Sequence, residues 1–121
     1  MTGIDAILET LNSQYSFDAR GRIQAARLDG ILPRFVLGRA AEGCIWRFRA
    51  GLDEATVAAL ARLAGRESGA SFEGELPAPP ERLFALSRIL TDAGAGDSGA
   101  APRRSAITRE GVVRGELWLF D

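Results

Sequence analysis

The chain has 121 residues and a formal net charge of −1, with 46% hydrophobic and 26% charged residues, a composition typical of one soluble globular domain. It contains no histidine, and all fifteen basic residues are arginine. These absences exclude Ser-His-Asp and Cys-His catalysis, Schiff-base chemistry on lysine and the lysine of a phosphate loop. Most zinc sites also need histidine, so we expect no metal. The balanced charge argues against a nucleic-acid partner.

The expected compartment follows from the single cysteine and from the hydropathy pattern. Cys44 has no second cysteine with which to form an internal disulfide, as is usual in a reducing compartment. No apolar run approaches the roughly 18 residues that span a bilayer, and the N-terminus has no basic segment typical of a signal peptide. We therefore expect a cytoplasmic protein without membrane contact.

The first predicted element is a helix that begins after Thr2. Apolar residues recur at helical spacing, at Ile4, Ile7, Leu8 and Leu11. Thr2 and Asp5 have the spacing of a capping box, and Asn12-Ser13 is predicted to end the helix. Residues 15–24 then contain a turn that Asp18 opens and that Gly21 closes with a positive φ, with a short strand on either side.

A β-hairpin is the strongest local prediction, between Arg34 and Ala50. Segments 34–39 and 44–49 flank a four-residue loop at 40–43, which would place Leu37 opposite Trp46 and Phe35 opposite Phe48. One face should then belong to the core: Phe35, Leu37, Cys44, Trp46 and Phe48. The other face should be wetter: Arg34, Val36, Ile45, Arg47 and Arg49.

Two further helices are predicted. The first runs from about Asp53, its N-cap, to Ala64, and Gly65 ends it. After a long loop at 65–80, Pro77-Ala78-Pro79-Pro80 is expected to start the second helix, with proline in its first turn. The apolar side of that helix comprises Leu83, Leu86, Ile89 and Leu90, with Phe84 flanking it.

The last part of the chain is predicted as a flexible connection followed by one strand. Residues 92–104 are rich in glycine and alanine. The glycines at 94–99 invite comparison with a phosphate loop, but the strand, helix and lysine that such a loop needs are missing. The strand is expected at Val112–Phe120. Its apolar residues point to both faces, as in a central strand covered on both sides.

These elements predict a single α+β domain over residues 1–121. About three helices should pack on an antiparallel sheet of about four to five strands. The predicted core comprises Ile7, Leu11, Phe35, Leu37, Trp46, Phe48, Val57, Leu60, Leu83, Leu86, Leu90, Leu117 and Leu119.

Six segments along the chain form a recognisable series of structural motifs, at 15–23, 33–39, 42–49, 52–63, 79–82 and 111–118. Taken in this order, they resemble the N-terminal portion of bacterial two-domain proteins of the GNAT N-acetyltransferase superfamily. The similarity covers nearly the whole chain.

The resemblance implies a role beside a catalytic module. In that superfamily, acetyl-coenzyme A lies on a Gln/Arg-x-x-Gly-x-Gly/Ala turn between a strand and a helix, where backbone N–H groups meet the pyrophosphate. Four segments come near this pattern without fitting it, at 27–32, 39–44, 66–71 and 109–111. The resemblance therefore implies a companion domain with no catalytic residue and no cofactor of its own. It would pack against an acetyltransferase module and shape its acceptor side, and acetyl-coenzyme A would belong to that module.

Two other functions remain open. The chain could be a stand-alone interaction module that self-associates. An enzyme in its own right is disfavoured because histidine, lysine and a nucleotide-binding turn are missing.

Three arginines are the candidate binding residues. Arg34, Arg47 and Arg49 fall on one face of the predicted hairpin, and their guanidinium groups could bind an anion or a partner. Arg34 would face Arg49 across the strands, and the like charges would repel. A bound anion or acids such as Glu73 or Glu75 would relieve this repulsion. The alternative is a solvated strand face with internal ion pairs.

The remaining polar and aromatic candidates have simpler structural interpretations. Cys44 could be a reactive thiol, but we expect a small buried side chain. Trp46, Phe48 and Trp118 could line a ligand cleft, but large aromatics more often anchor a core. The carboxylate pairs at 73/75 and 53/54 suggest solvation and helix capping rather than acid–base catalysis.

Overall fold

The computed structural model describes residues 2–27, 30, 32–93 and 101–121. Within these residues the fold is α+β with three helices, as predicted, and it has six strands. In chain order the elements are α1 (Gly3–Gln14), β1 (Tyr15–Phe17), β2 (Ile23–Ala26), β3 (Phe35–Ala40), β4 (Gly43–Phe48), α2 (Glu54–Ala64), α3 (Leu83–Asp92), β5 (Arg103–Arg109) and β6 (Val112–Phe120).

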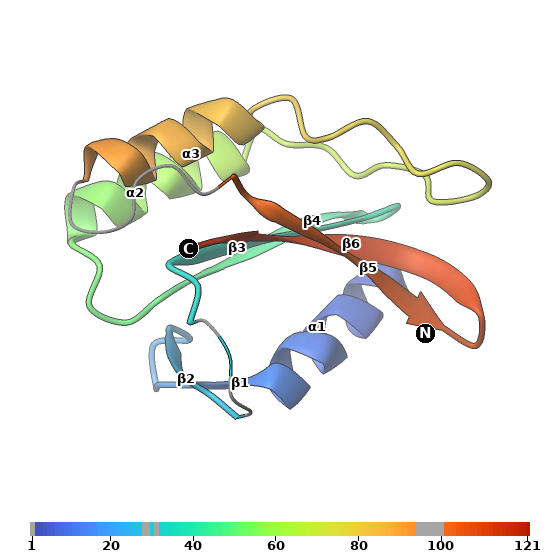
Figure 1. The fold of residues 1–121 in the computed structure, drawn as a ribbon, viewed down its shortest axis with the longest axis horizontal. Coiled ribbons are helices and arrows are strands. Elements are labelled where there is room, and N and C mark those ends of the chain that lie inside the picture. The colour runs from blue at the N-terminus through green and yellow to red at the C-terminus, as the bar shows by residue number, and fades with distance from the viewer. Residues whose placement is uncertain (1, 28–29, 31, 94–100) are drawn as a thin grey trace.

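The centre of the molecule is a four-stranded antiparallel sheet in the order β4-β3-β6-β5. Helix α1 lies on one face of this sheet, and α2 and α3 lie side by side on the other (Figure 1). Strands β1 and β2 form a separate hairpin next to the end of α1. The sheet is therefore the middle of three layers, and each face has its own apolar core.

Helix α1 begins as predicted but runs further than predicted. The Thr2 hydroxyl accepts the Asp5 N–H at 3.1 Å, and the Asp5 carboxylate accepts the Thr2 N–H at 3.2 Å, which completes the capping box. Asn12 and Ser13 lie inside the helix rather than at its end. Ser13 is accommodated because its hydroxyl donates to the Thr10 carbonyl one turn earlier.

The turn at 18–21 has the predicted chemistry. The Asp18 carboxylate accepts the N–H groups of Arg20 and Arg22, both at 2.9 Å. Gly21 has a φ of 78°, a conformation that glycine adopts without steric cost.

The β3–β4 hairpin has the predicted register and a shorter loop than predicted. Phe35 pairs with Phe48, and Leu37 pairs with Trp46. Ala40 and Gly43 pair as well, so the loop has two residues instead of four. Gly43 makes the tight turn possible because its φ of 143° is one that side-chain-bearing residues rarely adopt.

The prediction that the second hairpin face would be wetter is wrong. Val36 is fully buried and Ile45 is half-buried against the same core cluster, because α1 lies across this face. Gly38 on β3 allows the close approach. A Cβ atom there would lie 2.8 Å from Cγ2 of Ile7.

Ten of the thirteen predicted core residues are buried, and three are only partly buried. Trp46 and Phe48 are half-buried because β4 is at the edge of the sheet. Leu119 is half-buried on the α1 side, near the end of β6. The apolar residues of β6 point alternately into the two cores, so its prediction as a central strand with both faces covered is confirmed with the same bounds.

Helix α2 agrees with its prediction, whereas the start of α3 does not. The Asp53 carboxylate caps α2 by accepting the Thr56 N–H. The prolines at 77–80 precede α3 rather than forming its first turn, and the Pro80 carbonyl accepts the Leu83 N–H at 3.2 Å. Phe84 does not flank the apolar side of α3; it points to solvent and is 87% exposed.

The prediction of a flexible connection at 92–104 is wrong at both of its ends. Asp92 belongs to α3, and residues from Arg103 onward form β5, a strand that was not predicted. Its sequence, RRSAITR, shows little alternation of apolar and polar residues, and only Ile107 of its seven residues is buried. The glycine-rich segment at 94–99, compared above with a phosphate loop, lies outside the described residues.

Candidate functional site

The outer side of β4 is an open sheet edge. Strand β4 pairs with β3 on one side. On its other side, backbone pairing with the described residues occurs at the strand's end, where Ile23 of β2 bridges to Arg49 and its carbonyl accepts the Ala50 N–H at 2.9 Å. Before that point a shallow hollow of about 340 Å³ follows the strand, lined by Cys44, Ile45, Trp46 and Arg47. We call this segment of β4, Cys44–Arg47, the β4 edge.

The register shows which backbone groups the β4 edge presents. In an antiparallel pair, the residues that exchange hydrogen bonds alternate with those that do not. The two-residue turn makes Ala40 and Gly43 a hydrogen-bonding pair, so Ile45 and Arg47 also direct their N–H and C=O groups toward β3. Cys44 and Trp46 therefore direct theirs outward.

Of the groups on the β4 edge, the Trp46 carbonyl already has a partner within this chain. It accepts a hydrogen bond from Nη1 of Arg47 at 2.8 Å. A charged side chain folded over an edge carbonyl is one way in which proteins keep open edges from pairing at random. A strand that pairs with β4 would have to displace this guanidinium.

The opposite edge of the sheet is less suited to receiving a strand. In β5 the register shifts between Ile107 and Thr108, and such an irregularity interrupts regular pairing. Three of the seven residues of β5 are arginines: Arg103, Arg104 and Arg109. The β4 edge is therefore the more accessible of the two for backbone pairing.

The three predicted binding arginines, Arg34, Arg47 and Arg49, are near one another in the hairpin. Their guanidinium groups, however, donate hydrogen bonds to different backbone carbonyls. Arg34 donates to Leu90 at 3.0 Å and to Asp121 at 2.8 Å. The Arg49 side chain donates to the Leu32 carbonyl at 3.3 Å, and the Arg47 side chain donates to the Trp46 carbonyl.

The backbones of Arg34 and Arg49 do lie opposite each other, since the Arg49 N–H donates to the Arg34 carbonyl. Anion binding by these arginines stays a prediction.

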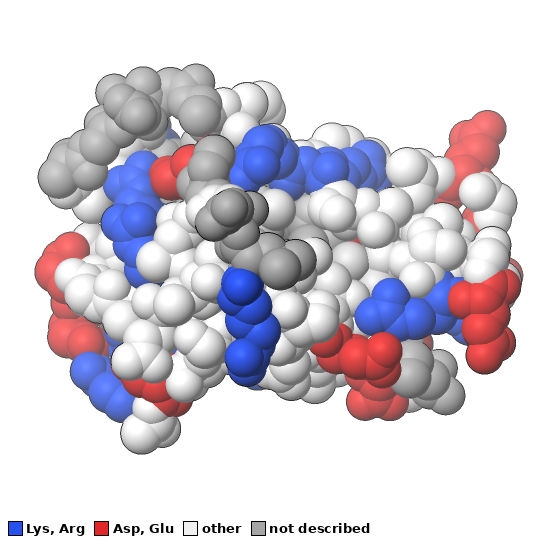
Figure 2. Space-filling view, turned by 60° about the horizontal axis from the view of Figure 1, so that its bottom comes forward, with Lys and Arg blue, Asp and Glu red and all other residues white. Residues whose placement is uncertain are grey.

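The surface charge is mixed. Basic and acidic side chains form separate small groups among uncharged residues on the face shown in Figure 2. Neither Glu73 nor Glu75 forms an ion pair with a described arginine, so these acids do not relieve the repulsion between Arg34 and Arg49. Asp53 caps α2, and Glu54 pairs with Arg20 at 3.1 Å.

Cys44 is half-buried, and its Sγ lies 3.4 Å from the Ser68 carbonyl oxygen. Burial raises the pKa of the Cys44 thiol to about 11, and the positive charge of Arg39 offsets only part of this rise. A thiol with a raised pKa is a poor nucleophile at neutral pH because little of it is ionised. The geometry therefore favours the structural interpretation of Cys44.

We expect Cys44 to react slowly with a disulfide reagent in the folded protein. A rise of the pKa from 9.0 to about 11 lowers the thiolate fraction at pH 8 by about 100-fold. The native rate should increase about tenfold for each pH unit up to pH 11. Stopped-flow labelling in buffer and in urea measures this effect, and equal rates in the two conditions at pH 8 would contradict it.

The aromatic candidates belong to the core under α2 and α3. Trp118 is 6% exposed, and Trp46 and Phe48 pack against the same cluster. Phe35 joins β3 to its neighbours on both sides, with ring centroids 5.5 Å from Phe48 and 5.3 Å from Phe120.

The sequence analysis missed a buried charged cluster on the same face of the sheet. Glu116 of β6 is fully buried. Its Oε2 accepts from Nε of Arg39 and from the Trp118 indole N–H, both at 2.8 Å, and its Oε1 accepts from Nε of Arg104 at 2.5 Å. We call these four residues the Glu116 cluster.

The Glu116 cluster also holds the loop that leads to α3. Nη2 of Arg39 donates to the Ala78 carbonyl at 2.6 Å, and Nη2 of Arg104 donates to the Pro77 carbonyl at 2.7 Å. The Arg104 guanidinium lies 5.2 Å from the centroid of the Trp118 ring, within the range of a cation–π contact. The cluster therefore joins β3, β5, β6 and the proline-rich loop.

The segments compared with the acetyl-coenzyme A turn do not join a strand to a helix. Residues 39–44 span the turn between β3 and β4 and include the ends of both strands, and 109–111 span the turn between β5 and β6. Residues 66–71 follow α2 in a loop, and 27–32 include residues outside the described part. In the described residues no group of three or more acidic or cysteine side chains could hold a metal ion.

Comparison with known proteins adds no identification. No family model, curated protein or solved structure matches this chain. Within the described residues, no helix has the length and apolar character needed to cross a membrane.

Proposed function

We propose that this chain is a non-catalytic docking domain, the companion half of a GNAT-type acetyltransferase module. The β4 edge receives an extended strand of that module. The observation that carries the proposal is the outward backbone at Cys44 and Trp46. It offers both N–H groups and the Cys44 C=O to an added strand, and the Trp46 C=O joins them when the Arg47 guanidinium is displaced. The acetyl-coenzyme A site and the catalytic residues belong to the module.

The chemistry of the edge supports a strand as the ligand. Both faces of the sheet are covered by helices, so an added strand would extend an existing core rather than cover an exposed one. Trp46, half-buried beside the hollow, supplies apolar surface on one side. Main-chain hydrogen bonds provide affinity in this mode of binding, and the neighbouring side chains provide specificity. The free thiol of Cys44 fits a reducing compartment, and we propose a cytoplasmic location.

The test uses the acetyltransferase module encoded in the same reading frame or in an adjacent gene. The module is recognised by its Arg/Gln-x-x-Gly-x-Gly/Ala turn between a strand and a helix. Titration calorimetry of that module with this chain should give a saturable complex. Cys44→Pro removes one outward N–H while leaving the bonds to β3, and it should weaken the complex at least about tenfold.

Cys44→Val is the matched control because it keeps the N–H. It should bind like the unaltered chain, and circular dichroism should show that both variants fold. The proposal is wrong if no such module is encoded, if the module does not bind, or if Cys44→Pro binds as well as Cys44→Val. Self-association of the chain alone, abolished by Cys44→Pro, would overturn it in favour of a stand-alone dimerisation module.

A further inference from the structure

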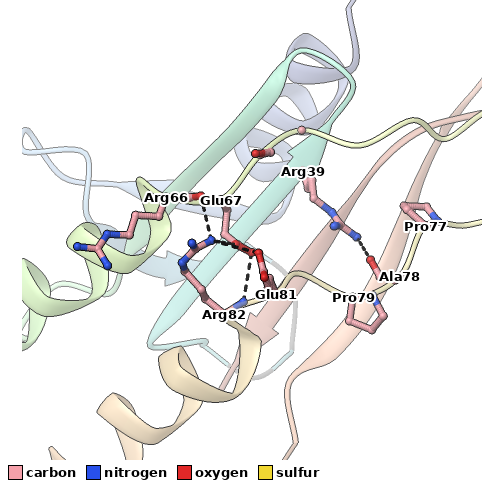
Figure 3. Close-up of a pocket in the computed structure, with 10 residues that line it drawn as sticks. Arg39, Arg66, Glu67, Pro77, Ala78, Pro79, Glu81 and Arg82 are labelled. Carbon is pink, nitrogen blue, oxygen red and sulfur yellow. Dashed lines mark hydrogen bonds and ion pairs between the residues drawn. The ribbon is translucent and has the colours of Figure 1, made fainter.

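A second concave region lies beside the Glu116 cluster and has a different set of lining residues from the hollow along β4. It is an open pocket of about 480 Å³ between the loop after α2 and the segment before α3, with Arg39 of β3 among its lining residues. Figure 3 shows the Glu67–Arg82 pair on one side of this pocket and Arg39 with Pro77, Ala78 and Pro79 on the other. We call it the Arg39 pocket.

One guanidinium nitrogen of Arg39, Nη1, has no hydrogen-bond partner among the described residues. Its side chain is only 8% exposed, and Nε and Nη2 are engaged by Glu116 and by the Ala78 carbonyl. Nη1 forms no hydrogen bond or ion pair with any of the described residues. Every fully buried side-chain nitrogen and oxygen atom of the described residues does have a hydrogen-bond partner, so an unpaired Nη1 is not fully buried. Nη1 is therefore accessible to solvent, and the accessible space beside Arg39 is the pocket.

The charges around this nitrogen favour an anion. The Glu116 cluster contains two guanidinium groups and one carboxylate, which leaves one positive charge in excess. On the other side, the Glu67 carboxylate is 4% exposed and is neutralised by Arg82 at 3.0 Å. Glu81, with a side chain 86% exposed, lies in water at the rim. A solvent-screened acid opposes an anion only weakly, whereas a buried guanidinium forms strong hydrogen bonds to oxyanions.

We propose that the Arg39 pocket binds a small oxyanion, a carboxylate or a phosphate group, through Nη1 of Arg39. The proposal does not depend on docking at the β4 edge. It uses only groups that the Glu116 cluster already holds in position, so binding needs no rearrangement of β3 or β6.

The test is a titration of the folded chain with sodium acetate and, separately, with inorganic phosphate, at constant ionic strength set by chloride. Backbone amide NMR signals of the residues at 67–69 and 78 report on the pocket. We expect saturable shifts there, with a dissociation constant on the order of 1 mM. Saturation by acetate alone identifies a carboxylate ligand, saturation by phosphate alone identifies a phosphate ligand, and either supports the site.

Variants of Arg39 would leave Glu116 partly unpaired, so the test variant is Ala78→Glu. Ala78 is exposed and lines the pocket, and the new carboxylate would compete for Arg39 and weaken binding at least about tenfold. Ala58→Glu, at an exposed position of α2 away from the pocket, makes the same change in charge and should bind normally. The proposal is wrong if neither anion saturates, or if Ala78→Glu and Ala58→Glu bind equally well. Neither variant alters the β4 edge, so failure here is distinguishable from failure of the docking proposal.

Discussion

Replacing Glu116 with alanine is expected to lower the free energy of unfolding by about 3–5 kcal/mol, because it leaves the buried Arg39 and the partly buried Arg104 guanidinium groups without their counter-charge. It also removes the acceptor of the Trp118 indole N–H. A loss of this size is a large fraction of the total stability of a small domain. Urea denaturation followed by circular dichroism measures it.

Glu81→Ala is the matched control for Glu116→Ala. Glu81 is an exposed glutamate whose only ion pair among the described residues is a 3.8 Å contact with Arg82. Its loss should cost less than about 1 kcal/mol. If the two variants had similar denaturation midpoints, the Glu116 cluster would not be the structural junction described above.

Phe35→Ala is expected to destabilise the fold by about 3–5 kcal/mol, the cost of removing a buried aromatic side chain and leaving a cavity. Phe35 is fully buried and contacts the rings of Phe48 and Phe120 on the two neighbouring strands. The same denaturation experiment measures the effect.

Phe84→Ala removes the same side chain from an exposed position. Phe84 is 87% exposed on α3, and its replacement should change stability by less than about 0.5 kcal/mol. A loss of several kcal/mol from Phe84→Ala would show that this side chain is covered in solution. A small loss from Phe35→Ala would contradict the position of the core under α2 and α3.

The sequence was sufficient to predict the elements whose signals are local. The capping box of α1, the Asp18 turn and the pairing of Leu37 with Trp46 depend on neighbouring residues or on one hairpin register. The bounds of β6 follow from Val112 and Val113 directly after Gly111 and from the apolar run Leu117–Phe120 at its other end. In each case a few side chains of known preference decide the structure.

The features that were missed depend on residues far apart in the chain. The face of Val36 was expected to be wet because nothing in the hairpin shows that α1 covers it. Strand β5 has only one buried residue, Ile107, and is held mainly by pairing with β6.

The Glu116 cluster joins positions 39, 104, 116 and 118, so no single segment contains it. One sequence signal was available: a lone glutamate next to the apolar run of Leu117–Phe120. A carboxylate in a central strand needs a cationic partner, and Arg39 at the end of β3 is such a partner. Which arginine pairs with it follows only from the register of β3 with β6.

The most direct test of the docking proposal is amide hydrogen exchange at the four residues of the β4 edge, in the free chain and in the presence of the acetyltransferase module. In the free chain, the outward amides of Cys44 and Trp46 should exchange quickly, and the inward amides of Ile45 and Arg47 should exchange slowly. On addition of the module, Cys44 and Trp46 should become as protected as Ile45 and Arg47. If Cys44 and Trp46 exchange at the same rate with and without the module, a strand does not pair with β4, and the proposed function is wrong.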